Sequence, residues 1–299
     1  MDIAITGSTG LIGEALRTSL VADGHRVVRV VRRSPTGADQ IGWDPDADRL
    51  DPTDLAGLDA VVHLAGEGIA EKRWTDAQKA RIETSRTRGT DLLARRLAEA
   101  SDGPRVLISG SAIGYYGDRG DDVLTEASGP GTGFLAGVCQ KWEAAADPAR
   151  RAGIRVAHLR TGIVLDAHGG VLAKQLPLFR LGLGGRIAGG RQYMSWITLA
   201  DEVAAIRWLL DHDLDGAVNL TAPAPATNRE FTEALAGVLH RPAFLPVPSF
   251  GPKVIFGGEL VDELLLAGQR VLPERLTASG FAFAHPTLAP ALEAVLAER

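Results

Sequence analysis

Short, almost continuously apolar runs alternate along the first half of the chain with longer segments in which apolar residues recur every three or four positions. The expected strands are residues 3–6, His25–Val31, Ala60–Leu64, Arg105–Ser109 and Arg155–Leu159. The expected helices are Leu11–Asp23, which ends at Gly24, Asp76–Ala100 and Gly137–Ala152. Nearly continuous apolar strands separated by amphipathic helices are typical of parallel sheets covered on both faces. The pattern predicts an α/β protein with a Rossmann-like, doubly wound parallel sheet.

From about Asp166 this alternation stops. Four stretches predict long loops and short helices: Leu181–Arg191, Trp196–Leu210, Ala222–Thr227 and Arg241–Pro252. We therefore expect a Rossmann domain over residues 1–165. A smaller C-terminal α/β lobe over residues 166–299 follows it, with segments that return to the sheet.

Three glycines join the first expected strand to the first expected helix. They are Gly7, Gly10 and Gly13, spaced as in the dinucleotide-binding motif. The first glycine permits a tight turn, the second lets the backbone approach a pyrophosphate, and the third lets the helix lie close to the strand. The free N–H groups and the positive dipole end of the helix then face the phosphates. The strand, turn and helix context makes this motif a predicted dinucleotide site.

The end of the second strand indicates which dinucleotide binds. An NAD site usually has an acidic residue there, which accepts hydrogen bonds from the ribose 2′-hydroxyl and repels a 2′-phosphate. This chain has Arg32, Arg33 and Ser34 instead. A guanidinium group binds phosphate through two donors in a fixed fork. We expect NADP(H), with a merely solvated basic strand end as the alternative.

Composition and charge exclude several other classes of function. The net charge is −5, and the arginine pairs are scattered, so we expect no nucleic-acid partner. The single cysteine, Cys139, and seven dispersed histidines provide no metal-binding motif. No apolar run reaches the roughly 18 residues that a membrane span needs, and a strand that begins at residue 2 leaves no room for a signal peptide. These features favour a cytoplasmic protein without a metal ion.

Several motifs resemble those of the extended short-chain dehydrogenase/reductases. They are Gly-Ser-Thr-Gly-Leu-Ile-Gly at 7–13, His-Leu-Ala-Gly at 63–66 and Ser-Gly-Ser-Ala-Ile-Gly-Tyr-Tyr-Gly at 109–117. Further segments are similar to an atypical branch of that family, the sugar-nucleotide epimerase-like proteins, which carry a C-terminal domain of their own. These segments include Trp74, Ser85-Arg86, Lys141-Trp142-Glu143, Ser195-Trp196-Ile197 and residues 226–231. The resemblance covers the whole chain.

The glycine motif and the resemblance together assign a set of cofactor-binding residues. By analogy, Leu64 to Gly66 flank the adenosine and ribose, Arg86 reaches the cofactor, and Thr161 to Val164 pass the nicotinamide. The full set is Gly7, Thr9, Gly10, Leu11, Ile12, Gly13, Arg32, Arg33, Ser34, Leu64, Ala65, Gly66, Arg86, Ser109, Thr161, Gly162 and Val164. On residue pattern alone, the more common outcome for Arg86 is a surface arginine of a charged helix.

Dehydrogenases of this superfamily exchange a proton through a Tyr-x-x-x-Lys pair on one helix face, in which the lysine lowers the tyrosine pKa. Alignment on Glu143 places Leu135 at the tyrosine position and Cys139 at the lysine position. Neither side chain can do that work. Lys141 lies about 200° around the helix from the required face, so we expect it to be a solvated surface lysine. Cys139 is expected to be buried and inert rather than reactive.

Ser111 matches the family's catalytic serine, and Tyr115 is the candidate proton donor beside it. Each has a plainer alternative, because Ser111 can simply leave room for nicotinamide, and Tyr115 and Tyr116 can form the substrate-pocket wall. Without a lysine, a tyrosine keeps a pKa near 10 and is a poor base. In the lobe, the glycine-rich turns at 184–186 and 189–191 place Arg186 and Arg191 for a substrate phosphate or carboxylate, or simply at the surface.

These residues support two functions. The first is an NADP(H)-dependent epimerase or oxidoreductase acting on a small polar substrate, with a nucleotide sugar as a candidate. The second is a non-catalytic NADPH-binding sensor or interaction protein, which the loss of the Tyr-x-x-x-Lys pair suggests. The resemblance further implies a homodimer formed through the helices near residues 76–100 and 137–152.

Overall fold

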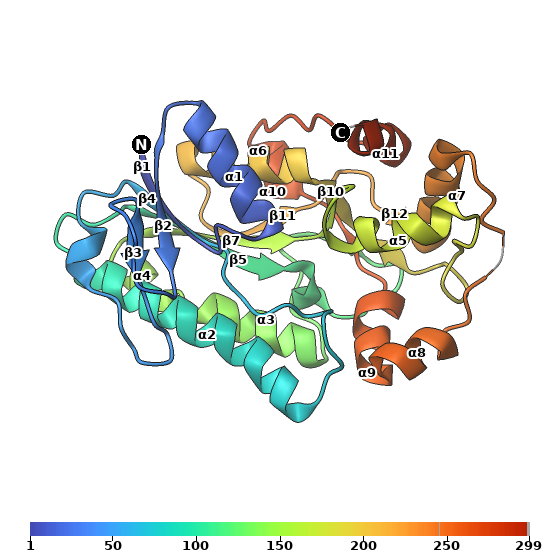
Figure 1. Ribbon diagram of the computed structural model, residues 1–299, viewed down its shortest axis with the longest axis horizontal. Helices are drawn as coiled ribbons and strands as arrows, with labels where there is room; N and C mark the ends of the chain where they lie inside the picture. Colours follow the sequence, from blue (N-terminus) through green and yellow to red (C-terminus); the bar gives the residue numbers. More distant parts are fainter. Residues whose placement is uncertain (245, 298–299) are drawn as a thin grey trace.

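A seven-stranded sheet forms the centre of the protein in a computed structural model that describes residues 1–244 and 246–297 (Figure 1). The strand order is β11-β7-β5-β4-β1-β2-β3, and all six neighbouring pairs are parallel. The strands are β1 (Asp2–Thr6), β2 (Arg26–Val31), β3 (Gln40–Gly42), β4 (Ala60–His63), β5 (Val106–Ala112), β7 (Arg155–Thr161) and β11 (Gly216–Leu220). The predicted Rossmann-like α/β fold is confirmed. The edge strands β3 and β11 were not predicted individually.

Helices cover both faces of this sheet (Figure 1). One face carries α1 (Leu11–Ala22) and α6 (Leu199–Asp211), and the other carries α2 (Asp76–Glu99), α3 (Phe134–Ala144) and α4 (Asp147–Arg151). The expected single helix over Gly137–Ala152 is wrong, because α3 ends at Ala144 and α4 begins anew at Asp147. Pro148 has no N–H to donate and suits the first turn of a new helix.

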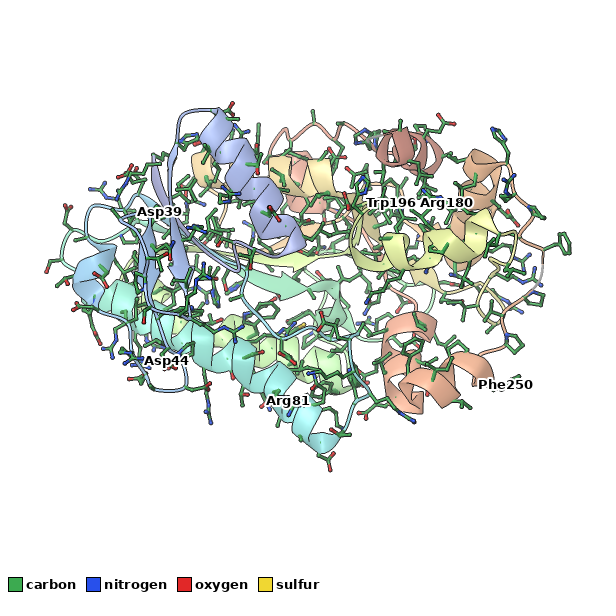
Figure 2. All side chains as sticks on the ribbon, viewed as in Figure 1. Asp39, Asp44, Arg81, Arg180, Trp196 and Phe250 are labelled. Atoms are coloured by element: carbon green, nitrogen blue, oxygen red, sulfur yellow. The ribbon has the colours of Figure 1, made fainter. Side chains whose placement is uncertain are left out.

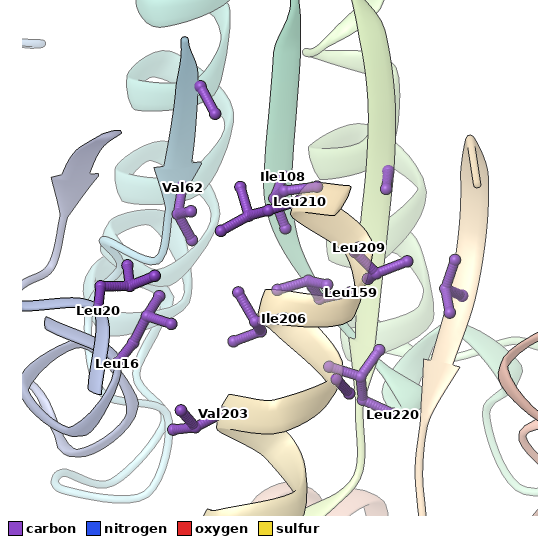
Figure 3. Close-up of a cluster of buried hydrophobic side chains, with 14 of the residues drawn as sticks. Leu16, Leu20, Val62, Ile108, Leu159, Val203, Ile206, Leu209, Leu210 and Leu220 are labelled. Carbon is purple, nitrogen blue, oxygen red and sulfur yellow. The ribbon is translucent and has the colours of Figure 1, made fainter. Parts of the chain in front are cut away.

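The largest apolar cluster in the described residues lies between the sheet and the α1–α6 pair (Figure 3). Apolar side chains of five strands of the sheet meet the inner faces of both helices, and the cluster includes Val62, Ile108, Leu159, Leu220, Leu16, Leu20, Val203, Ile206, Leu209 and Leu210. The expectation of loops and short helices over Trp196–Leu210 is therefore wrong. That stretch forms β10 (Trp196–Thr198) and the 13-residue helix α6, which packs on the sheet.

The C-terminal lobe has its own small core around Trp196. The helices α5 (Gly170–Arg180), α7 (Asn228–Leu239) and α11 (Leu288–Ala297) surround it. Trp196 lies inside the molecule, whereas Phe250, at the start of α8 (Phe250–Phe256), lies at its outer rim (Figure 2). None of the helices in the described residues is long and apolar enough to cross a membrane.

Short two-stranded pairings connect the lobe to the Rossmann part. β8 (Ile163–Leu165) pairs with β10, and β6 (Val123–Leu124) pairs with β13 (Arg270–Val271). β9 (Tyr193–Met194) pairs with β12 (Ala226–Thr227) within the lobe. Residues 245 and 298–299 of the predicted lobe lie outside the described part of the chain.

Candidate functional site

The turn between β1 and α1 has the geometry of a phosphate cradle. Gly7 adopts φ +66°, and a Cβ on it would lie 2.8 Å from the carbonyl carbon of Leu64, so only glycine fits. A Cβ on Gly13 would overlap the carbonyl of Gly7, which explains why the helix needs glycine to approach the strand. Gly10 is the N-cap of α1 and provides no side-chain cap. The first amides of α1 are therefore available to an external anion.

A buried hydrogen-bond chain fixes the loop after β4 beside this turn. The hydroxyl of Thr6 accepts the backbone N–H groups of Leu64 (3.0 Å) and Ala65 (3.1 Å). Its own proton must then go to Nδ1 of His63, 2.7 Å away, so His63 carries its proton on Nε2 and donates it to Thr90 at 3.0 Å. Burial lowers the pKa of His63 to about 4, which keeps the ring neutral. The chain holds the predicted adenosine-side loop, Leu64 to Gly66, in one position.

Arg32, Arg33 and Ser34 follow β2 and are exposed at the carboxyl edge of the sheet. Neither arginine forms an ion pair within residues 1–244 and 246–297. Thr9 is also exposed, and Leu11 and Ile12 are partly exposed at the start of α1. The structure thus brings the glycine turn, the Leu64–Gly66 loop and the end of β2 to adjacent strands at one edge of the sheet.

Arg86 extends from α2 toward the same edge. Its Nη1 donates to the carbonyls of Glu67 (2.9 Å) and Ile82 (3.1 Å), and the guanidinium lies 5.0 Å from the ring centroid of Trp142. A Cβ on Gly66 would come within 3.3 Å of its Cζ. The surface alternative for Arg86 is therefore wrong, because the half-buried guanidinium is enclosed by Gly66, Trp142 and two backbone carbonyls; burial also lowers its pKa.

Ser109 and Ser111 lie on β5, at the centre of the sheet, and have different environments. Ser109 is fully buried, with only a 3.5 Å contact to the carbonyl of Gly110. Ser111 donates its hydroxyl proton to Glu143 at 2.7 Å. Because a hydroxyl has one proton, Ser111 cannot polarise a carbonyl of a substrate while this bond is made.

Glu143 and Arg160 form the buried charge pair of the site. Arg160, on β7, donates from Nε (2.8 Å) and Nη2 (2.9 Å) to the two oxygens of Glu143. The pair is nearly sealed from solvent, with side-chain exposures of 5% and 14%. Burial raises the pKa of Glu143, but its hydrogen bonds and the charge of Arg160 outweigh that effect, so the carboxyl stays ionised and is a weak base.

Both tyrosines contact the guanidinium of Arg160, and their rings are 5.4 Å apart in an edge-to-face arrangement. The Tyr115 ring is half-buried, and its centroid is 3.4 Å from the guanidinium carbon. Tyr116 is fully buried, and its hydroxyl accepts from Arg160 at 3.0 Å and donates to Asn219 at 2.7 Å. The alternative that Tyr116 forms part of the substrate-pocket wall is therefore wrong. Burial raises its pKa, the opposite of what a base needs.

The helix α3 carries no proton-transfer pair. Leu135 and Cys139 are both buried, and burial raises the pKa of the Cys139 thiol to about 12, so the cysteine is inert as expected. Lys141 is 60% exposed and pairs with Glu83 of α2 at 2.8 Å, as a surface lysine should. Glu263, from the short π-helix η3 (Asp262–Leu266), accepts the backbone N–H groups of Phe134 and Leu135 at 2.7 and 2.8 Å. A segment of the C-terminal lobe thus caps the helix.

The segment after β7 is tied to the lobe. The amide of Gly162 donates to the carbonyl of Leu220, and a Cβ on it would lie 2.6 Å from the carbonyl oxygen of Ser195. Val164 follows in β8, and Thr161 donates its hydroxyl proton to Glu202 of α6 at 2.8 Å. Glu202 is fully buried, its Oε2 has no partner in the described part of the chain, and burial raises its pKa to about 8.

The predicted arginines of the lobe lie in a turn beside α7. Arg186 is half-buried next to Gly190, and Arg191 is exposed. Neither has an acidic partner among the residues that the structure describes.

Sequence reasoning missed two groups of this site, Arg160 and Glu202. A charged residue inside a buried strand or on the buried face of a helix requires a buried partner. The expected strand ended at Leu159, before Arg160, and Glu202 lay in a stretch that was not expected to form one long helix, so this signal could be used only once the bounds of β7 and α6 were known.

The sequence pattern of the NAD dependent epimerase/dehydratase family matches residues 3–221, and a domain of unknown function, DUF1731, matches residues 247–295. An epimerase family protein of Mycobacterium bovis is 47% identical over 291 residues, which cover 97% of this chain and 96% of that protein.

Two solved structures are also similar. The crystal structure of human epimerase family protein SDR39U1 with NADPH is 34% identical, covers 100% of both chains and superposes with a TM-score of 0.91. A nucleoside-diphosphate sugar epimerase from Corynebacterium glutamicum is 37% identical with a TM-score of 0.78; the match covers 98% of this chain but 57% of that one.

Proposed function

The chain belongs to the NAD dependent epimerase/dehydratase family, and we propose that it binds NADP(H) and acts as an epimerase or oxidoreductase on a small polar substrate. The observation that carries this proposal is the glycine-lined start of α1, which has no side-chain cap, with the Leu64–Gly66 loop held beside it. Two arginines follow β2 without an ion-pair partner among the described residues. The human relative whose crystal structure contains NADPH supports the choice of cofactor. The similarity to a nucleoside-diphosphate sugar epimerase makes a nucleotide sugar the first candidate substrate.

The residues present fit such a cofactor. The first amides of α1 would hold the pyrophosphate, and Arg32 and Arg33 would hold the 2′-phosphate. Thr161, Gly162 and Val164 would form the wall along the nicotinamide. When bound, the cofactor supplies or accepts a hydride.

Proton transfer distinguishes this site from that of a standard dehydrogenase. Leu135 has no proton to give, and the Cys139 thiol stays protonated at neutral pH. Ser111 donates to Glu143, which Arg160 keeps ionised. Tyr115, whose half-buried ring packs on the guanidinium of Arg160, is the remaining candidate proton donor, and solvent can take that role where the substrate is open to water.

The same hydrogen bond from Ser111 to Glu143 favours a second candidate function. In this site the Ser111 proton is donated to Glu143, and Leu135 and Cys139 stand at the positions of the family's tyrosine and lysine. Such a site can bind NADPH without turnover, as a sensor or interaction protein does. The two functions require the same cofactor site and differ only in hydride chemistry.

The experiment therefore has two stages. Calorimetry first compares NADPH and NADH on the wild type and on Arg32→Glu and Arg33→Glu; we expect NADPH to bind more tightly and the preference to fall in both variants. An unchanged preference for NADPH over NADH would contradict the assignment of these arginines to the 2′-phosphate.

In the second stage, NADPH oxidation is measured with carbonyl compounds and nucleotide sugars as substrates. Turnover that Ser111→Ala abolishes, with NADPH affinity intact, eliminates the binding-only function; no turnover across the panel favours it.

We also propose a cytoplasmic protein that forms a homodimer through α2 and α3. The outer face of α2 is polar, with exposed Arg81 and Arg88, so such a dimer would rest on polar contacts.

A further inference from the structure

Eight large apolar side chains are exposed at the outer end of the C-terminal lobe. They come from the end of α5 with the turn after it, from the loop 241–249 and from α8; Figure 2 labels Arg180 and Phe250 at this end of the molecule. Between 42% and 75% of each residue is exposed, and they make up eight of the twelve exposed large apolar residues in the described chain. We call them the apolar rim: Leu178, Leu181, Leu183, Phe244, Phe250, Val254, Ile255 and Phe256. Monomeric proteins rarely expose a contiguous apolar patch of more than roughly a few hundred Å², and larger patches mark an interaction site.

Hydrogen bonds hold the segments of the apolar rim side by side. The N–H of Val247 donates to the carbonyl of Arg186 (2.8 Å), and the N–H of Ala188 donates to the carbonyl of Val247 (3.0 Å). Nε of Arg241 donates to the carbonyl of Arg180 at 2.9 Å. α8 begins three residues after Val247, and prolines at positions 242, 246, 248 and 252 restrict the backbone of this segment. The apolar rim is therefore preorganised, so binding costs it little conformational entropy.

Basic residues accompany the apolar rim, although the chain as a whole carries a net charge of −5. Residues 170–198 and 241–257 contain no aspartate or glutamate, and they contain Lys174, Arg180, Arg186, Arg191, Arg241 and Lys253. Of these six cations, only Lys253 has an acidic partner within the described ranges, Asp262 at 2.7 Å. The acids that follow on α9 (Gly258–Val261) and η3 are engaged elsewhere, Glu259 with Lys79 and Glu263 with the start of α3. Even when Arg229, Glu230 and Glu233 of α7 are added, seven cations stand against two acids, so the apolar rim lies in a positive field.

The exposure and the charge of the apolar rim decide between possible partners. A groove that binds a peptide covers the sides of its own lining residues, whereas Leu181, Phe244 and Phe250 are each 70–75% exposed. A second copy related by twofold symmetry would bring the arginines of both copies against one another, which costs free energy. An anionic bilayer matches both features, because its interfacial layer takes up apolar and aromatic side chains and its surface attracts Lys and Arg.

We propose that the apolar rim attaches the protein reversibly to a bilayer surface that contains anionic phospholipids. The exposed phenylalanine, leucine, isoleucine and valine side chains enter the interfacial layer, and Arg180 and Arg241 lie among the phosphates of the headgroups. Arginine suits that place, because its guanidinium binds phosphate through two donors. Such attachment requires no membrane-spanning helix. It is also independent of the proposed function, because no residue of the apolar rim belongs to the predicted cofactor site.

The test is flotation of the protein with vesicles of two compositions, phosphatidylcholine alone and three parts phosphatidylcholine to one part phosphatidylglycerol. We expect the wild type to bind the anionic vesicles, to bind the neutral ones far less, and to be released by high salt, which screens the arginines. Phe250→Ser should weaken binding to the anionic vesicles about tenfold, because it removes an inserted aromatic side chain. Arg241→Gln should weaken it about fivefold.

Matched variants outside the apolar rim serve as controls. Val254→Ser removes a valine that is 70% exposed in the rim, and Val21→Ser removes one that is 53% exposed on α1. We expect about threefold weaker vesicle binding for Val254→Ser and no change for Val21→Ser. Arg88→Gln is the control for Arg241→Gln, because the Arg88 side chain is 62% exposed on α2. An unchanged melting temperature checks that each variant is folded.

The inference is overturned if the wild type binds neither kind of vesicle, if it binds both equally, or if the rim variants and their controls bind alike. A dimer that forms without lipid and that Phe250→Ser dissociates in sedimentation velocity would assign the apolar rim to a second copy. Binding of a synthetic acidic amphipathic helix, without binding of vesicles, would assign it to a protein partner. Either result also overturns the inference.

Discussion

Replacement of Glu202 by glutamine should stabilise the protein at neutral and alkaline pH and leave it unchanged in acid. The carboxyl is fully buried on α6, one oxygen accepts the Thr161 hydroxyl, and the other has no partner within the described chain. Burial raises its pKa from 4.5 to about 8. The folded protein therefore holds a proton on Glu202 in a pH range where the unfolded chain has released it.

The sign and size of the effect follow from linkage. Stability is full below pH 4.5, falls as the pH rises from 4.5 to about 8, and is constant above that. A difference of about 3.5 pKa units corresponds to about 5 kcal/mol, of which about 3 kcal/mol is already lost at pH 7. Glutamine keeps the acceptor for Thr161 and cannot ionise, so it avoids this loss.

Urea unfolding at pH 4.5, 7 and 9 measures the difference between wild type and Glu202→Gln. We expect about 0, 3 and 5 kcal/mol in favour of the variant. Glu233→Gln is the control, because Glu233 is exposed on α7, and it should change stability by less than about 0.5 kcal/mol at each pH. A constant difference between wild type and Glu202→Gln from pH 4.5 to 9 would refute the reasoning.

Three further predictions concern other parts of the structure. Burial lowers the pKa of His63 from 6.5 to about 4, so His63 contributes stability above pH 6.5 that is lost as the pH falls toward 4. Between these pH values, the free energy of unfolding in urea should fall by about 3 kcal/mol less for His63→Asn than for the wild type. An equal fall in both proteins would contradict this prediction. Glu143→Gln leaves the buried Arg160 uncompensated and should cost about 3–5 kcal/mol of unfolding free energy, against about 1 kcal/mol for Ser111→Ala; equal losses in chemical denaturation would argue against a buried ion pair. Sedimentation velocity should show a dimer, and a monomer at micromolar concentration would rule out the α2–α3 interface.

Local sequence signals predicted the N-terminal unit well. β1, α1 and β2 are specified by apolar periodicity and by glycines whose role depends on residues a few positions away, such as Gly7 and Gly13. The burial of Cys139 and the exposure of Lys141 followed from helix periodicity in the same way.

Other features depend on contacts between distant segments. β11 contains Asn219, a residue disfavoured in strands, whose side chain is satisfied by Tyr116 and by the carbonyl of Leu272. The cap on α3 comes from Glu263, more than a hundred residues away. Local patterns carry no information on such partners, so the seventh strand and the closure of α3 could not be predicted from them.

The position of β11 at the edge of the sheet affects the folding of the chain during synthesis and the choice of fragments for expression. The sheet is complete only when β11 (Gly216–Leu220) has joined β7, and α6, which covers the sheet, precedes β11 in the chain. A fragment that stops near residue 165 would leave the edge of β7 unpaired and Leu159 exposed. Because an unpaired strand edge and exposed apolar side chains promote association, such a fragment should aggregate. During synthesis, the Rossmann part therefore cannot complete its sheet until residue 220, about two fifths of the way through residues 166–299, has been made, and an expressed fragment should keep the two parts together.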